Sequence, residues 1–331
     1  MAVVLLLSCG VYASSSENPA SGMDEWIISD EAGSYGYYEF DADTKEVTFV
    51  PPSEIPEADY EPVPAEIPDE IFDTDEPNAD ITPFSVIGTD LRSKVSNPSG
   101  RYASTCLIAS RFGPNDNDVS KGTGWLLNNS YLVTAGHLLY DPDYTHNDNK
   151  GYALHVAVYV GSSGGTYKQY RKGHKYKVGT NYANAPADSG GYFLEGIKDD
   201  WGIVKLETPL TVNVGHLGRR QVNNASQMTA SRYYTQGYPV DRNIGTYGTS
   251  WWKYDMYTSY GEIKQDASLY TVYTTLDTDG GMSGGPVYYL DSNLGYCADA
   301  IHVAGTNGGV RPYNTALLIT PDLWKIIKEV T

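Results

Sequence analysis

The sequence predicts an all-β domain that ends in one helix and follows an acidic, mostly extended segment. From residue 102 onward, short β-branched and aromatic runs alternate with clusters of Gly, Asn, Asp and Ser, a spacing typical of a β-barrel or a β-sandwich. The 29 tyrosines suit strands, where aromatic side chains pack across neighbouring chains. A helical pattern is convincing only at residues 321–330, where Leu323, Ile326 and Ile327 share one face.

The segment at residues 14–84 holds the negative charge of the chain. It contains 20 Asp and Glu residues and a single basic residue, Lys45, in a chain whose formal net charge is −18. High charge and low apolar content disfavour a packed core, although residues 35–40 and 46–50 could pair as one small hairpin. The remaining chain is close to neutral and lacks a Lys- or Arg-rich stripe, so we expect no binding to nucleic acid or to anionic membranes.

A targeting signal is indicated at residues 1–13. An apolar run at residues 2–7 precedes a small-residue cleavage site at residues 11–13, as at the end of a secretory signal peptide. The basic leading region of such a peptide is missing, as in a truncated start. A lipoprotein signal ending at Cys9 is the weaker alternative, because Leu7 is bulky where such sites prefer a small residue. We therefore expect a secreted, extracellular protein.

Two cysteines, Cys106 and Cys297, remain once Cys9 leaves with the signal. They could form one disulfide in an oxidising compartment or stay as two buried thiols. The sequence leaves both alternatives open, because it cannot show whether the two β-carbons meet. No cluster of His, Cys and Asp has the spacing of a zinc site, so we expect neither a metal nor a cofactor.

The stretch "GMSGGPVY" at residues 281–288 marks Ser283 as a candidate nucleophile. It fits the G-x-S-x-G elbow of α/β-hydrolases and also the serine loop of a trypsin-like peptidase. An α/β-hydrolase needs alternating helices, and its acid and histidine follow the serine. Only 48 residues follow Ser283, and His302 is the one histidine among them. We therefore interpret the elbow match as accidental.

The trypsin-like alternative requires the order His, Asp, Ser, and the chain supplies each residue in context. "TAGH" places His137 directly after an apolar strand, and "DDWGIVKL" places Asp200 directly before one. Asp199 is the rival acid, but Asp200 is adjacent to Trp201 and the strand. His137 would take the proton of Ser283, and Asp200 would orient the imidazole and stabilise its cation.

An oxyanion hole is expected in the same serine loop. The backbone N–H groups of Gly281 and Ser283 would stabilise the negative oxygen of the tetrahedral intermediate. Glycine at positions 280 and 281 lets the backbone turn so that these two donors converge.

The chain resembles the bacterial glutamyl endopeptidases, relatives of V8 protease with the chymotrypsin fold. The likeness runs from about residue 85 to residue 320 and includes "SVIGTDLRSKVSNPSGRY", "TGWLL", "TAGH", "DWGIVKL", "QGYPVD", "DTDGGMSGGPVY" and "AIHVAGTNGG". It implies a double β-barrel and a serine protease domain at residues 85–331. It also implies an extracellular endopeptidase that hydrolyses polypeptide substrates after glutamate.

The resemblance also implies which residues recognise glutamate. In this family the preference is attributed to a histidine, a threonine and the α-amino group of the mature N-terminus. By position these are His302, Thr278 and the amine of Ser85 or Val86. Such groups can hold a carboxylate through charge-assisted hydrogen bonds, which are the strong ones.

An N-terminal amine in the specificity pocket gives the acidic segment a role. Residues 14–84 would be a propeptide whose removal near Phe84 activates the enzyme, and a mere acidic spacer is the alternative. A cut between Phe84 and Ser85 does not follow glutamate, so we expect a second, activating protease. We expect the mature enzyme to be a monomer.

Some positions depart from the family pattern or favour other functions. Asp279 stands where an uncharged residue is usual, and Val303 stands where a polar residue is usual. Asp277 lies six residues before Ser283 and could support cleavage after Lys or Arg instead. Preference for small or apolar residues, and a catalytically dead binding module of the same fold, are further alternatives.

Overall fold

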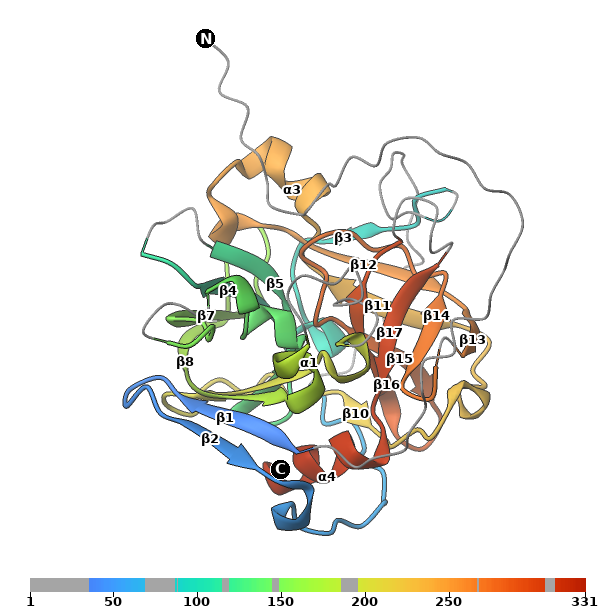
Figure 1. Cartoon of the computed structure of the whole chain (residues 1–331). Coiled ribbons are helices and arrows are strands. Elements are labelled where there is room, and N and C mark those ends of the chain that lie inside the picture. Colours follow the sequence, from blue (N-terminus) through green and yellow to red (C-terminus); the bar gives the residue numbers. More distant parts are fainter. Residues whose placement is uncertain are drawn as a thin grey trace, which may run out of the picture. The chain divides into compact units, whose positions relative to one another are not determined.

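The computed structural model describes residues 36–68, 87, 89–114, 119–144, 149–185, 196–266, 268–306 and 313–331 (Figure 1). The described residues all belong to one compact unit. The expected signal peptide, Phe84 and the expected terminal residues Ser85 and Val86 lie outside the described residues.

Most of the regular structure consists of strands in two sheets. The first sheet contains β1 (Tyr37–Asp41), β2 (Val47–Val50), β4 (Thr105–Arg111), β5 (Val119–Leu126), β6 (Tyr131–Thr134), β7 (His155–Val160), β8 (Gln169–Gly179) and β9 (Gly202–Leu206). The second sheet contains β3 (Ser93–Val95), β10 (Gly218–Arg219), β11 (Tyr233–Gly237), β12 (Met256–Gly261), β13 (Ile263–Asp266), β14 (Thr271–Thr274), β15 (Pro286–Asp291), β16 (Gly295–Ala304) and β17 (Asn314–Leu318). The all-β expectation is confirmed.

The helices of the described residues are short. The α-helices are α1 (Thr180–Asn184), α3 (Val240–Tyr247) and α4 (Pro321–Glu329). The 3-10 turns are η1 (Pro52–Glu54), η2 (Gly100–Tyr102), η3 (Gly136–Leu138), η4 (Pro142–Tyr144), η5 (Ile197–Asp199), η6 (Ala225–Gln227) and η7 (Trp251–Lys253).

The first sheet closes into a barrel through strand β8. The order β8-β7-β4-β5-β6-β9 returns to β8 because β9 pairs with both β6 and β8. Strand β8 is 11 residues long, so two other strands can pair with it one after the other along the same edge. Residues 169–172 pair with β7, and residues 175–179 pair with β1.

The barrel interior is apolar and tightly filled. Ile108, Leu132, Val158 and Val204 are fully buried there, one from each of four strands. Burying each such side chain contributes about 1.5–3 kcal/mol. Cys106 lies in the same cluster as a free thiol, and Cys297 lies as a free thiol in a separate cluster of the second sheet. The disulfide alternative is therefore not realised.

The second sheet is an open strip over the described residues, with β13 and β3 at its ends. Helix α4 follows its strand β17 and ends the fold, as the sequence predicts. Thr320 caps the helix by accepting a hydrogen bond from Leu323 N, and Pro321 takes the first helical position, where the missing N–H costs nothing. The buried face carries Trp324, Ile326 and Ile327.

Sequence patterning does not indicate helices α1 and α3. Helix α1 has five residues, too few for a repeat. Helix α3 has eight residues, includes Gly245 and buries only Asn243, so its apolar pattern is weak. Gly248 ends it at φ +54°, a conformation that favours glycine.

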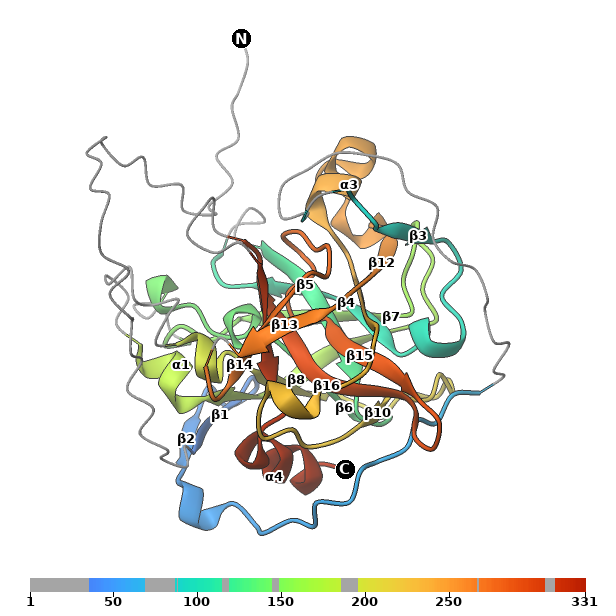
Figure 2. The same ribbon diagram turned by 90° about the vertical axis from the view of Figure 1, so that its right-hand side faces the viewer.

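The expected hairpin in the acidic segment is confirmed as β1 and β2. Beyond β2 the chain runs past α4 toward β10 with little regular structure (Figure 2). Val63 and Glu66 form isolated bridges with Arg219 and His216. Among the described residues, no helix has the length and hydropathy needed to cross a bilayer.

Candidate active site

The barrel topology brings His137 and Asp200 together. His137 lies in η3 after β6, and Asp200 lies between η5 and β9. Strands β6 and β9 are antiparallel neighbours, so the end of one lies beside the start of the other. His137 Nδ1 is 2.8 Å from Asp200 Oδ2, and the His137 backbone N–H donates to Asp200 Oδ1 over 2.8 Å. The carboxylate therefore orients both the ring and its backbone.

The pKa of His137 is raised above its ordinary value by this pairing. Burial lowers the pKa, but the charge and the hydrogen bond of Asp200 outweigh burial, and Asp141 adds to the rise. When Nδ1–H donates to Asp200, Nε2 keeps its lone pair and can accept a proton. The pair therefore has the electronic arrangement of a general base with its orienting acid.

The neighbouring Asp199 has different partners. Its carboxylate accepts hydrogen bonds from Trp201 Nε1 at 2.6 Å and from Asn181 N at 2.9 Å. Burial raises its pKa to about 7. The geometry therefore favours Asp200 over Asp199 as the partner of His137.

The glycines around Ser283 are required by close backbone packing. Gly281 has φ +95° and Gly284 has φ +86°, conformations that other residues rarely adopt. A β-carbon at position 281 would overlap the carbonyl oxygen of Tyr238, and one at position 284 would overlap that of Thr123. The "GGMSGG" pattern is therefore the sequence signature of this tight loop.

Thr123 of β5 ties the serine loop to the barrel. Its N–H donates to Ser283 O at 2.8 Å, and its Oγ1 donates to Gly281 O at 2.8 Å. Thr134, three residues before His137, donates from Oγ1 to Thr123 O at 2.6 Å. Thr123 is the first residue of the "TGWLL" motif, but nothing in that motif indicates that its hydroxyl holds the serine loop.

The same anchoring leaves two backbone donors available. The carbonyls of Gly281 and Ser283 are held by Thr123, whereas the N–H groups of both residues have no hydrogen-bond acceptor among the described residues. Two free N–H groups beside a serine are what an oxyanion hole requires.

His302 lies beside the serine loop. Its carbonyl accepts from Gly284 N at 2.7 Å, and its N–H donates to Gly285 O at 2.8 Å. Burial lowers the pKa of His302 to about 3, with a further lowering by His137, so the imidazole is neutral at ordinary pH. Among the described residues, His302 Nδ1 and Thr278 Oγ1 are buried and have no hydrogen-bond partner.

Two unpartnered polar atoms at this depth need an explanation. Leaving a buried donor or acceptor unsatisfied costs about 1–3 kcal/mol. Such groups commonly complete their hydrogen bonds with a ligand or with water. Ser85 and Val86, the other residues expected at this site, lie outside the described residues.

Asp277 and Asp279 both have backbone partners. Asp277 accepts from Ile87 N at 2.9 Å and from Leu91 N at 2.7 Å. Both of its oxygens are thus occupied by the segment that follows the expected mature N-terminus. Asp279 accepts from Asp241 N at 3.0 Å, in the first turn of α3, and burial together with Asp241 raises its pKa.

The surroundings of Asp277, Asp279 and Val303 explain these three residues, which the family pattern and the alternative specificities had brought into question. The engaged oxygens of Asp277 disfavour a role in binding Lys or Arg. The bond of Asp279 to α3 accounts for a charged residue at that position. Val303 packs in the apolar core and is 2% exposed, which explains an apolar residue beside His302.

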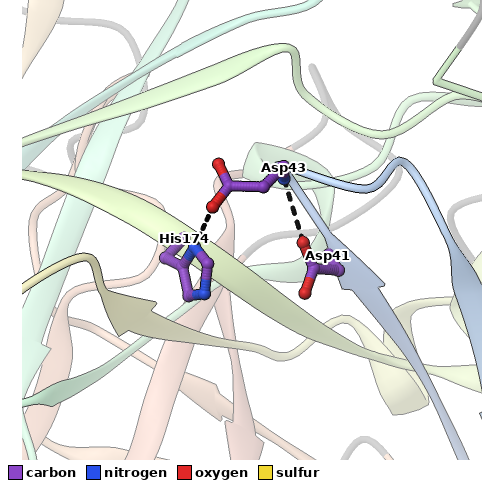
Figure 3. Close-up of side chains that lie close together, drawn as sticks. All are labelled: Asp41, Asp43 and His174. Atoms are coloured by element: carbon purple, nitrogen blue, oxygen red, sulfur yellow. Dashed lines mark hydrogen bonds and ion pairs between the residues drawn. The ribbon is translucent and has the colours of Figure 1, made fainter.

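One group of potential metal ligands occurs among the described residues, and it lies on the hairpin and β8 (Figure 3). Asp43 Oδ2 is 3.1 Å from His174 Nδ1. Asp41 accepts from Asp43 N and Thr44 N and pairs with Lys175 Nζ at 3.2 Å. These partners already occupy the acidic oxygens of Asp41, so the group is an ion-pair contact between two strands.

The closed barrel, the open second sheet and the His–Asp pair beside a glycine-rich serine loop define a chymotrypsin-like serine endopeptidase. Residues 104–316 match the family model described as Trypsin. The chain belongs to this family and is similar to its glutamyl endopeptidases.

Two curated relatives span most of the chain. One, a Bacillus subtilis protein named extracellular metalloprotease, is 32% identical over 252 residues, which cover 75% of this chain and 70% of the relative. The other, the glutamyl endopeptidase of Bacillus licheniformis, is 26% identical over 245 residues, which cover 72% of this chain and 67% of the relative.

A solved structure of a Glu endopeptidase in complex with MPD aligns with a TM-score of 0.58 at 25% identity. The alignment covers 74% of this chain and 98% of that one. It extends the likeness from sequence to the chymotrypsin-like fold.

Proposed function

We propose that the protein is an extracellular endopeptidase that cleaves after glutamate, with His137, Asp200 and Ser283 as its catalytic triad. His137 Nε2 takes the Ser283 hydroxyl proton as Oγ attacks the peptide carbonyl. The oxyanion accepts hydrogen bonds from Gly281 N and Ser283 N. The protonated His137, stabilised by Asp200, then gives its proton to the leaving amine.

The acyl-enzyme is hydrolysed by the reverse use of the same groups. A water molecule loses its proton to His137 as it attacks the ester carbonyl, and the oxyanion again lies at Gly281 and Ser283. His137 then returns the proton to Ser283 Oγ as the ester bond breaks. No group beyond the chain and one water is needed for this cycle.

The proposal of glutamate recognition is supported by one observation: within the described residues, the buried atoms His302 Nδ1 and Thr278 Oγ1 have no hydrogen-bond partner. A substrate carboxylate would accept hydrogen bonds from a neutral imidazole and from a hydroxyl. His302 supplies no positive charge, because burial holds its pKa near 3. The terminal amine of Ser85 or Val86 would supply that charge after maturation.

Maturation is proposed to proceed by a cut near Phe84, which breaks the peptide link between the propeptide 14–84 and the catalytic domain. Asp277 supports this proposal, because its carboxylate holds Ile87 N and Leu91 N. These contacts fix the chain two residues or fewer beyond the proposed new terminus. Ile87 is therefore held at Asp277, the residue that precedes Thr278.

The test is the cleavage specificity of the matured chain that starts at Ser85. Peptides that differ only in the residue before the cut carry Glu, Asp, Gln, Lys or Phe. We expect strong preference for Glu and loss of all cleavage in Ser283→Ala. Preference for Lys would transfer specificity to Asp277, and equal cleavage of Glu and Gln peptides would overturn the carboxylate pocket.

A further inference from the structure

We propose that residues 36–68, named here the strap, stay bound to the catalytic domain after maturation, so that the active enzyme consists of two chains. The proposal rests on the proposed maturation cut and requires only that the cut falls within residues 69–86. The strap would then be a permanent subunit of the enzyme. Activation would depend only on the new N-terminus of the catalytic domain.

Strand β1 of the strap completes the barrel sheet. Residues 37–41 pair antiparallel with residues 175–179, the half of β8 that β7 does not reach. Loss of β1 would expose an unpaired edge on β8. Natural proteins avoid such edges because they template pairing with other chains.

Phe40 of β1 is a core residue of the barrel. It is fully buried and stacks on Tyr152, with ring centroids 4.8 Å apart and planes at 6°. Tyr176 packs on it at 5.7 Å. Removing a buried aromatic ring leaves a cavity whose lining cannot fully collapse. Release of the strap would therefore open the apolar interior of the barrel to water.

Tyr37 is buried at the opposite end of β1 beside the last helix. Its hydroxyl accepts from Lys177 Nζ at 2.9 Å and lies 3.2 Å from a carboxylate oxygen of Glu329. Its ring packs edge-on against Trp201 at 6.5 Å. The strap is thus joined to α4 and to the residue that follows Asp200.

The second half of the strap pairs with the catalytic domain through its backbone. Five N–H···O bonds of 2.7–3.0 Å connect Val63 with Arg219, Glu66 with His216, and Ala65 with Leu294. Further along α4, Trp324 Nε1 donates to Asp59 O at 2.7 Å. Backbone pairing of this kind holds an extended segment whatever its side chains are.

Glycines of the catalytic domain make room for this half of the strap. A β-carbon at Gly218 would lie 2.8 Å from Ala65 N, and one at Gly215 would overlap Glu66 O. Both glycines lie outside the propeptide, so the catalytic domain itself has a surface shaped to the strap.

Ion pairs add to the contact but do not carry it. Lys325 pairs with Glu57 at 2.8 Å and Lys328 with Asp59 at 2.9 Å. Glu57 and Asp59 are mostly exposed, and exposed pairs contribute little and are screened by salt. We therefore expect high salt to leave the strap in place.

The strap leaves the catalytic groups accessible. Its hydrogen bonds and ion pairs within the described residues reach β8, α1, β10 with the preceding His216, α4 and the turn before β16. None of those printed for the described residues reaches His137, Asp200 or Ser283. Activity therefore does not require its release.

The test uses the full chain with a site-specific protease sequence inserted between residues 69 and 86. After the cut, size-exclusion chromatography and mass spectrometry follow both fragments in 0.15 M and 1 M salt. We expect them to elute together at one-to-one ratio at both salt concentrations and to separate only in denaturant. A free strap beside a folded, active catalytic fragment would overturn the proposal.

Two variants of the hairpin sharpen this test. Phe40→Ala should weaken retention of the strap by at least about 100-fold, from the usual cost of removing a buried aromatic ring. Phe49→Ala is the matched control, because Phe49 is 51% exposed on the same hairpin and packs only on Tyr38 among the ring contacts of the described residues. Its removal should weaken retention far less than Phe40→Ala. Equal retention in both variants would contradict the role of the barrel core.

This readout is independent of the proposed activity. Co-elution without glutamate preference would overturn the proposed specificity and leave the strap proposal intact. Release of the strap with glutamate preference retained would overturn the strap proposal and leave the proposed specificity intact. If Phe40→Ala does not fold, the cut of the unsubstituted chain decides the question alone.

Discussion

The two sides of the serine loop treat their buried polar groups in opposite ways. On one side, His137 and Asp200 satisfy each other at 2.8 Å. On the other side, His302 Nδ1 and Thr278 Oγ1 are buried and have no hydrogen-bond partner in the part of the chain that the structure describes. The base and acid proposed for bond cleavage therefore satisfy each other within the chain, whereas the two groups proposed for specificity keep an unused hydrogen bond among the described residues.

The largest expected effect is at the nucleophile. Ser283→Ala should lower kcat by about 10⁶-fold, the usual loss when a triad serine is removed. Ser292→Ala is the matched control, since Ser292 is exposed in the turn between β15 and β16. Peptide hydrolysis measures the loss, and thermal unfolding checks that both variants fold. Substantial residual hydrolysis by Ser283→Ala would contradict the proposed triad.

The next effect is at the acid of the pair. Asp200→Asn should lower kcat by about 10⁴-fold, because the amide no longer holds the productive imidazole tautomer. In the unsubstituted enzyme His137 must be neutral to act, and its pKa is raised above 6.5. Activity should therefore fall as pH falls, with a midpoint above 6.5, and Asp200→Asn should move that midpoint to lower pH.

Asp199→Asn is the control for Asp200→Asn, and it should also change how the stability of the protein depends on pH. The folded-state pKa of Asp199 is about 7 against an ordinary 3.8, raised by burial. Its protonated form is therefore favoured by folding, so its contribution to stability is lost as pH rises from about 4 to about 7. Asp199→Asn should flatten this loss while kcat stays within about tenfold. A loss as large as that of Asp200→Asn would reverse the assignment of the acid.

A smaller effect is expected where the barrel holds the serine loop. Thr123→Val removes the Oγ1 hydrogen bond to Gly281 O and keeps the backbone bond to Ser283 O. Losing one such bond should displace the oxyanion donors slightly and lower kcat by about tenfold. Thr123→Ser keeps the hydroxyl and should restore the rate. An unchanged rate in Thr123→Val would show that the anchoring has no kinetic role.

Local motifs account for what the sequence could predict of the site. The strand before "TAGH" and the strand after "DDWG" predict that His137 and Asp200 stand at strand ends. Antiparallel pairing of β6 with β9 then brings them together. The glycines at 281 and 284 predict a tight loop because only glycine fits its positive φ angles.

Other features depend on contacts that are remote in sequence. Thr123 lies 160 residues before Ser283 in the numbering, and nothing local indicates that its hydroxyl reaches Gly281. Asp279 faces α3 because its carboxylate accepts a hydrogen bond from Asp241 N in that helix, a residue that is remote in sequence. The acidic composition of the strap hides the buried positions of Tyr37 and Phe40, because the many acidic residues around them indicate a segment without a packed core.

The most direct test of the central claim is the ratio of kcat/KM for two peptides that carry Glu or Gln before the cut. We predict a ratio of at least about 100 for the matured enzyme, because Gln lacks the charge that the pocket is proposed to bind. His302→Ala should lower the ratio, because the substrate carboxylate loses one of its hydrogen-bond donors, while hydrolysis of the Gln peptide persists. An unchanged ratio in His302→Ala would contradict the claim that the unpartnered groups beside Ser283 recognise the substrate carboxylate.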